Sequence, residues 1–294
     1  MSGTFVVGET KIRPGVYTRY ENAGGVELAG ASNGVGAAII RANWGPLNKV
    51  TWIESPVDAA AAFGAPGTNL TVNIVDEMLA GGASKVAAVR AGTGGTAATI
   101  TLKDTAASPA NVVTITAKYP GARPFSVTIR DSLADARKRE CIIYSGTMEF
   151  EKVTFAKGAT GDGEPAALVA AFANSANFTV TKVADGNKTL AAVSSTAFTA
   201  GTNPTATSAE YSAALNLLEA AAWNVLIVDT SDTATHALVA AFIDRIYAAG
   251  SNCMAVLAEP KSIALATRMT NGAAFNDEKI IYPLNSAYDA SGTL

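Results

Sequence analysis

The chain contains a single histidine, His236, among its 294 residues. Histidine is the side chain that most often transfers protons in catalysis near neutral pH, and it is a common ligand of zinc. One copy excludes metal sites built from several histidines and leaves little scope for His-dependent catalysis. His236 falls in the first turns of an expected amphipathic helix, so we interpret it as an ordinary helix residue.

Charged and aromatic residues are scarce as well, at 16% and 7% of the chain. An ordinary soluble domain has roughly 25% charged residues, and a surface poor in charge is typical of one that other subunits cover. The net charge of −3 excludes the broad basic field that nucleic-acid binding requires. The densest basic cluster, Arg137-Lys138-Arg139, lies between Asp135 and Glu140, so we expect a solvated loop or helix face there.

Cysteine is limited to Cys141 and Cys253, which lie far apart among apolar neighbours and are expected to be buried, reduced thiols. The N-terminus lacks the charged segment followed by an apolar segment that marks a secretory signal peptide. No apolar run approaches the roughly 20 residues that a membrane-spanning helix needs. These absences predict a protein that is made in a cytoplasm and stays soluble there.

The first part of the chain is expected to contain an extended segment followed by alternating strands and helices. Residues 1–25 are expected to form an extended arm, because Pro14 and several glycines interrupt their apolar residues. Such a segment is too short to bury its own apolar side chains. Residues 26–92 alternate between strands and helices. Strands are expected at 35–40, 49–53 and 86–89, and helices are expected to begin at Ser55-Pro56 and to span 70–79.

The same alternation returns in residues 205–294. One helix begins at the capping-box pattern of Thr207 and Glu210, a second spans 233–249, and a third is expected to end at Asn271-Gly272. The second helix is expected to direct Leu238, Phe242 and Ile246 inward. Strands are expected at 225–228, 254–257 and 279–282. Helices that alternate with strands predict a parallel or mixed sheet.

Residues 93–204 have a different pattern. Apolar residues alternate there with Thr or Ser at a period of two, which is typical of half-buried antiparallel strands. The pairs are Ile100/Leu102, Val113/Ile115, Val127/Ile129 and Phe178/Val180. One helical segment, Glu164 to Asn174, interrupts them. The predicted fold class is therefore α/β (α+β): a discontinuous α/β domain from 26–92 and 205–294, with an inserted β-rich antiparallel domain and the extended N-terminal arm.

Two short motifs resemble sites that carry chemistry in other proteins. Gly30-Ala-Ser32-Asn-Gly34 matches the G-x-S-x-G nucleophile elbow, but an expected strand follows it where that motif needs a helix. A glycine-rich turn is the preferred interpretation, and a hydrolase that uses Ser32 with His236 is a distant alternative. We expect no enzyme activity and no cofactor.

The second motif, Asp229-Thr-Ser231-Asp-Thr233, follows an apolar strand and precedes a helix, where α/β sheets place ligands. It resembles the Asp-x-Ser-x-Ser pattern of metal-dependent adhesion sites, whose oxygens suit Mg²⁺. A binding module that uses Asp229, Ser231 and Thr233 is therefore the alternative function. The competing interpretation is that Ser231 or Asp232 caps the following helix.

Several other motifs, taken together, resemble one family. Ile12-Arg-Pro-Gly-Val-Tyr17 resembles the N-terminal motif of contractile tail sheath proteins from phages, prophages and phage-like particles. Further similar motifs follow in order at Asn43-Trp-Gly-Pro46, Val50-Thr-Trp-Ile53, Leu79-Ala-Gly-Gly-Ala-Ser-Lys-Val86, Lys118-Tyr-Pro-Gly-Ala-Arg123 and Trp223-Asn-Val-Leu-Ile-Val228. The sequence departs from the family at Pro124-Phe125, where Gly-Asn is frequent. It also stops at Leu294, without the further C-terminal module that such proteins usually have.

The resemblance implies a structural subunit. Such subunits polymerise in hexameric rings into a helical sheath around an inner tail tube, and the sheath contracts to drive that tube through the target cell envelope. The implied partners are further copies of the chain, the inner tube protein, and baseplate and tail terminator proteins, with no nucleic acid and no membrane. The implied location is the virion tail sheath, after assembly in the bacterial host cytoplasm. An arm would pair with strands of a neighbour, and the implied subunit-interface residues are Ile12, Arg13, Pro14, Gly15, Val16 and Tyr17.

Overall fold

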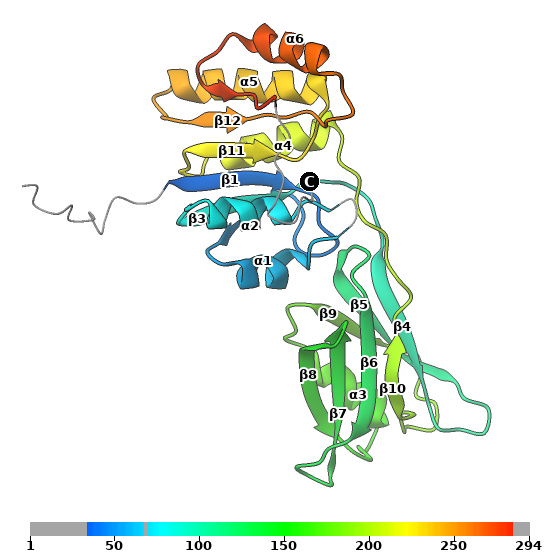
Figure 1. Ribbon diagram of the computed structural model, residues 1–294. Helices are drawn as coiled ribbons and strands as arrows, with labels where there is room; N and C mark the ends of the chain where they lie inside the picture. Colours follow the sequence, from blue (N-terminus) through cyan, green and yellow to red (C-terminus); the bar gives the residue numbers. More distant parts are fainter. Residues whose placement is uncertain (1–33, 68–69, 285–294) are drawn as a thin grey trace, which may run out of the picture. The chain divides into compact units, whose positions relative to one another are not determined.

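The computed structural model describes residues 34–67 and 70–284. Ser32 and the implied interface residues Ile12, Arg13, Pro14, Gly15, Val16 and Tyr17 lie outside the described residues. Within the described part, the strands form sheets of six, four and three strands, and helices occur along the whole stretch (Figure 1). This mixture of helices and strands confirms the predicted α/β (α+β) class.

The six-stranded sheet has the strand order β13-β12-β11-β1-β3-β2. Its pairs are parallel, except that the edge strand β2 runs antiparallel to β3. The central strand β1 (Val35–Ile40) is almost entirely buried, as its run of small and apolar residues predicts for a strand covered on both faces. The other strands are β2 (Val50–Ile53), β3 (Lys85–Arg90), β11 (Val225–Val228), β12 (Met254–Val256) and β13 (Ile280–Ile281).

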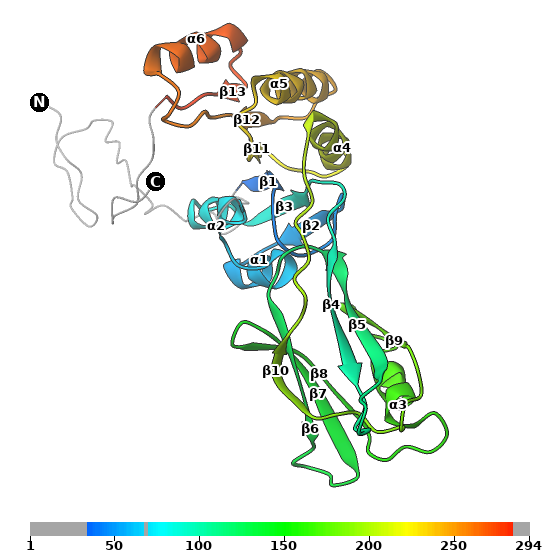
Figure 2. The same cartoon turned by 90° about the vertical axis from the view of Figure 1, so that its right-hand side faces the viewer.

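Helices cover both faces of this sheet, because successive residues of a strand point to opposite sides. Ala37 and Ile39 of β1 pack in one core with helices α4 and α5. Ala38 and Ile40 pack in a second core with α1 and α2, and Figure 2 shows the two pairs of helices on opposite sides of β1. The helices are α1 (Pro56–Phe63), α2 (Asn73–Ala80), α4 (Ser208–Leu218) and α5 (Thr233–Ala248).

The starts of these helices follow from their capping residues. The Ser55 side chain accepts an amide hydrogen bond from the first turn of α1, and Thr207 and Glu210 form the expected capping box of α4. Asp232 Oδ2 accepts a hydrogen bond of 2.8 Å from the Thr235 amide at the start of α5. Asp232 is therefore a helix cap, as the competing interpretation of its motif proposed.

The antiparallel strands form two sheets that share one hydrophobic core. Ile115 and Val127, from different sheets, both belong to that core, and Leu168 of helix α3 (Gly163–Ala171) joins them. Two packed sheets with alternating inward residues constitute a β-sandwich. The first sheet is β4 (Ala97–Lys103), β5 (Asn111–Pro120) and β9 (Phe178–Lys182). The second is β10 (Val193–Ala197), β6 (Phe125–Asp131), β7 (Lys138–Ser145) and β8 (Met148–Ala156).

The structure corrects the interpretation of the basic cluster. Lys138 and Arg139 begin strand β7, and Arg139 and Glu140 are buried, at 5% and 4% exposure. Arg137 is exposed in the turn before β7, as expected of a solvated loop, and Lys138 is exposed too, although it lies on the strand. Charged residues can be buried when they are paired, and Arg139 has its carboxylate partner, Glu164, 25 residues further along the chain.

Two further expectations about helices are wrong. The last helix, α6 (Leu265–Phe275), continues through Asn271-Gly272 and ends at Asn276, whose φ is 41°. A Cβ on Gly272 would lie 3.0 Å from the Tyr282 ring, so this glycine permits a close approach inside the helix. In α5, Leu238 is 40% exposed, whereas Phe242 and Ile246 are buried as expected.

Candidate functional site

A polar cluster lies at the carboxyl ends of β1 and β11, where Arg41 and Asp229 directly follow the two strands. The Asp229 side chain is fully buried, and its Oδ2 lies 2.8 Å from Arg41 Nε. Thr71 Oγ1 donates to the same oxygen at 2.6 Å, and the Tyr211 hydroxyl donates to Oδ1. The chain leaves these adjacent strands toward opposite sides of the sheet, which is the position where open α/β sheets bind ligands.

The electrostatics of this cluster leave Asp229 fully engaged. Burial lowers the pKa of Arg41, but the hydrogen bond and the negative charge of Asp229 outweigh that effect, and the pKa is raised above its ordinary value. Burial and the Asp229 charge raise the pKa of the Tyr211 hydroxyl, which keeps it protonated as a donor. A metal ion at Asp229 would have to displace the Arg41 guanidinium. Ser231 and Thr233 are exposed at the start of α5.

We therefore expect no Mg²⁺ binding that depends on Asp229. Calorimetric titration with Mg²⁺ should give the same heats for the unaltered chain and for Asp229→Ala. Asp232→Ala removes the same charge from an exposed position of the motif and serves as the control. Saturable binding that Asp229→Ala abolishes and Asp232→Ala retains would instead support the adhesion alternative.

His236 lies in α5 and is fully buried. Its Nε2 is 2.7 Å from the Thr230 carbonyl oxygen, so the main chain holds the ring. A general base has to come within hydrogen-bond reach of the proton that it removes, and His236 has no exposed nitrogen for that. Its other hypothetical partner, Ser32, lies outside the described residues.

Arg90, at the end of β3, is a buried cation that binds main-chain carbonyls. Its guanidinium donates to the carbonyl oxygens of Ala42, Gly45 and Pro120 at 3.0, 2.7 and 2.8 Å. Burial lowers the pKa of Arg90 to about 10, so it stays charged at neutral pH. Ala42 and Gly45 follow β1, while Pro120 ends β5. Arg90 thus joins the six-stranded sheet to the sandwich.

Two of the motifs that carry the family resemblance meet beside Arg90. Trp44 follows β1 but belongs to the sandwich core, where its ring lies 5.1 Å from those of Tyr119 and Phe125. The Arg123 amide donates to the Asn43 carbonyl at 3.2 Å. Gly121 has a φ of 153°, and a Cβ there would lie 2.0 Å from the Asn43 oxygen. The glycine and tryptophan of these motifs therefore have structural roles, which no local pattern revealed.

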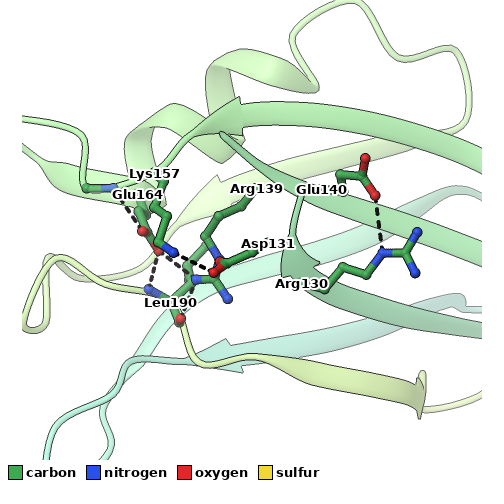
Figure 3. Close-up of polar contacts among 8 residues, drawn as sticks. Arg130, Asp131, Arg139, Glu140, Lys157, Glu164 and Leu190 are labelled. Carbon is green, nitrogen blue, oxygen red and sulfur yellow. Dashed lines mark hydrogen bonds and ion pairs between the residues drawn. The ribbon is translucent and has the colours of Figure 1, made fainter. Parts of the chain in front are cut away.

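A buried ion pair between Arg139 and Glu164 connects several elements at one end of the sandwich (Figure 3). Arg139 Nη1 lies 2.8 Å from Glu164 Oε2 and donates to the Leu190 carbonyl at 2.6 Å. Glu164 also accepts the amides of Gly158 and Leu190, at 3.0 and 2.8 Å. Arg139 further contacts Asp131 at 3.4 Å. One carboxylate thereby ties β7, the start of α3 and two loops together.

One half of a sheet face is left uncovered among the described residues. The core of α1 and α2 takes strand residues only from β1, β2 and β3, and Figure 2 shows these helices beside that half of the sheet. By register, the same face continues across β11, β12 and β13. Met254 and Ile281 are 38% and 45% exposed there. We call this surface the free sheet face; it consists of Val225, Ile227, Met254, Val256 and Ile281.

Both cysteines are free and buried, as the sequence predicted. Burial raises the pKa of the Cys141 thiol to about 12, which keeps it protonated and unreactive. In the part of the chain that the structure describes, no helix is long and apolar enough to cross a membrane.

Comparison with known proteins identifies the sandwich region. Residues 93–203 match the family described as "Phage tail sheath protein beta-sandwich domain". No curated protein sequence matches the chain.

Solved structures extend the similarity to nearly the whole chain. A sheath tail protein from Desulfitobacterium hafniense is similar over 95% of this chain and 58% of its own, with a TM-score of 0.66 and 20% identity. One from Listeria innocua is similar over 89% of this chain and 53% of its own, with a TM-score of 0.62 and 19% identity. The chain thus spans a little over half of each protein, with the same fold. These findings confirm the resemblance that the sequence motifs indicated.

Proposed function

We propose that the chain is a structural subunit of a contractile tail sheath, which polymerises into a helical tube around an inner tail tube and contracts to drive it through a cell envelope. The observation that carries the proposal is the match of residues 93–203 to the sheath sandwich family, together with a sheath-protein fold over most of the chain. The proposed role needs no catalysis, because assembly itself stores the energy that contraction releases.

The proposed organisation follows the sequence. Residues 1–25 are the arm, 26–92 and 205–294 form a discontinuous α/β domain, and 93–204 form the inserted domain. The proposed partners are further copies of the chain in hexameric rings, the inner tube protein, the baseplate and the tail terminator. The subunit would be assembled in the bacterial host cytoplasm and reside in the virion tail sheath. Contraction is then a rigid-body rearrangement of subunits held by their arms.

The free sheet face is the surface on which we place the arm of a neighbouring subunit. Its side chains are apolar on three adjacent strands, and within residues 34–67 and 70–284 the edge strand β13 pairs with β12 alone. An extended segment can add to such an edge through main-chain hydrogen bonds, while its side chains use the adjoining apolar surface. Residues 1–25 carry apolar side chains in an extended pattern, including Ile12, Val16 and Tyr17.

The double variant Met254→Lys/Ile281→Lys is expected to prevent assembly, because it puts two charges on the surface that the arm covers. The chain, expressed with any sequence that naturally follows Leu294, should form tubes or rings in negative-stain microscopy and sediment as large particles. The double variant should remain monomeric. Leu133→Lys, on a side chain 87% exposed in the β6–β7 turn, is the control and should assemble normally. Tubes of unchanged yield from the double variant would refute the placement of the arm. Absence of any ordered particle from the unaltered protein would count against the sheath role itself.

A further inference from the structure

A cavity of about 390 Å³ lies between α5 and α6, which are neighbours in Figure 1. The two helices line it mostly with small side chains, such as Ala237, Ala240 and Ala274, which leave the space between them open. Ala237 and Ala274 are exposed, so the cavity opens to solvent on this side. Ligand pockets in proteins have volumes of roughly 300–1,000 Å³, and this cavity lies at the small end of that range.

Three rings form the inner wall of the cavity. The Tyr282 ring lies 5.7 Å from that of Phe275 and 6.0 Å from that of His236, and all three residues line the cavity. His236 is fully buried, so its ring forms the inner end. Aromatic rings pack favourably against the edge or the offset face of another ring, so this wall suits a ligand that is itself a ring.

His236 also supplies the wall with an unpaired acceptor. Its Nε2 lies 2.7 Å from the Thr230 carbonyl oxygen. A carbonyl oxygen only accepts, so Nε2 carries the hydrogen, and Nδ1 of the neutral ring is an acceptor. Nδ1 is buried and has no hydrogen-bond partner among residues 34–67 and 70–284. Buried acceptors in proteins are almost always paired, so the wall suits a ligand with one N–H or O–H donor.

The other polar side chains of the inner wall have Glu259 beside them. Asn271 Nδ2 donates to Glu259 Oε1 at 2.9 Å. Burial and the adjacent Glu259 carboxylate raise the pKa of the Tyr282 hydroxyl, which keeps it protonated. Within the described part of the chain, no charged side chain lines the cavity itself. An ion is costly to bury without a partner, so the ligand that fits is neutral.

We propose that the cavity between α5 and α6 binds a small neutral ring compound whose hydroxyl or N–H group donates a hydrogen bond to Nδ1 of His236. Phenols and indoles have this chemistry. The ligand ring packs against Phe275 and Tyr282, and the hydrogen bond fixes its orientation. The site lies within one subunit, so it does not depend on the sheath role.

The single histidine makes binding directly measurable, with p-cresol as the probe. In the chain with ¹⁵N-labelled histidine and no histidine tag, His236 gives the only imidazole signals. We expect p-cresol to shift the Nδ1 resonance saturably, because its hydroxyl donates to that nitrogen, and to leave Nε2 nearly unchanged. Toluene has the same ring without the hydroxyl and should not produce this shift. No saturable shift with p-cresol, or an equal shift with toluene, would overturn the proposal.

Two variants of α6 locate the bound probe. Ala273 and Ala274 are both exposed on this helix, but of the two only Ala274 lines the cavity. Ala274→Leu fills the space, so p-cresol should bind at least about tenfold more weakly. Ala273→Leu is the matched control and should bind p-cresol as the unaltered chain does. Equal affinity of the two folded variants, checked by far-UV circular dichroism, would place the probe elsewhere and refute the proposal.

Discussion

Glu164→Ala is expected to lower the free energy of unfolding by about 3–5 kcal/mol, because it removes the counter-ion of a buried charge. The side chains of Arg139 and Glu164 are only 6% and 2% exposed, so water cannot replace the lost carboxylate. The change also leaves the Gly158 and Leu190 amides without their acceptor. Urea titration followed by far-UV circular dichroism measures the loss.

The matched control is Arg130→Ala, which breaks the neighbouring pair with Glu140. Arg130 is 47% exposed, and the buried Glu140 keeps a second partner, Lys152, at 3.1 Å. The loss of this half-exposed pair should therefore cost only about 0–1 kcal/mol. The double variant Glu164→Leu/Arg139→Met should regain much of the lost stability, because it removes both charges at once. If Glu164→Ala lowered the free energy of unfolding no more than Arg130→Ala does, the buried ion pair between Arg139 and Glu164 would not be a major source of stability.

The strands and helix starts that the sequence predicted correctly are those that neighbouring residues determine. The apolar run of β1 predicts a strand covered on both faces, and the capping residues Ser55 and Thr207 predict where α1 and α4 begin. The period-two alternation likewise locates β4, β5, β6 and β9. Each of these signals lies within about ten residues of the element that it specifies, so no knowledge of distant partners was required.

The sequence-based predictions were wrong where contacts with residues far along the chain determine burial or the end of a helix. Arg139 and Glu140 resemble a solvated face until Glu164, Lys152 and Arg130 supply their partners. The strands β7, β8 and β10 went unpredicted. Gly272 indicates a helix end by composition, but the Tyr282 ring that packs on it favours a continuous helix.

The same distinction applies to the polar cluster. Its place after β11 was predictable from the apolar run that precedes Asp229. Its chemistry was not, because Arg41 and Thr71 come from 188 and 158 residues away. Without them, a carboxylate in this position suggests a metal ligand. With them, the guanidinium already supplies the positive charge. The sequence could therefore predict that a polar site follows β11, but only the tertiary structure shows that Arg41, and not a metal ion, balances the charge of Asp229.

Trp44→Ala is the second change from which we expect a large effect, a loss of about 3–5 kcal/mol in the free energy of unfolding. Trp44 is 2% exposed, and its ring makes edge contacts with Tyr119, Phe125 and Phe150 at 5.1, 5.1 and 5.9 Å. It enters the sandwich core from the loop after β1. Its removal should therefore both open a cavity and weaken the link between the sheets, which far-UV circular dichroism during urea unfolding would detect.

Trp52→Ala is the matched control, since both tryptophans belong to motifs that resemble the sheath family. Trp52 lies on the edge strand β2, is 42% exposed, and carries Lys85 over its ring at 4.6 Å. An exposed cation–π contact contributes about 0.5–1 kcal/mol, so the control should lose roughly that amount plus a small burial effect. Equal losses from the two variants would show that Trp44 does not join the sheets. A selective loss at Trp44 would mean that its motif serves the junction between the sheets, on which the proposed rigid-body movement of the subunit depends.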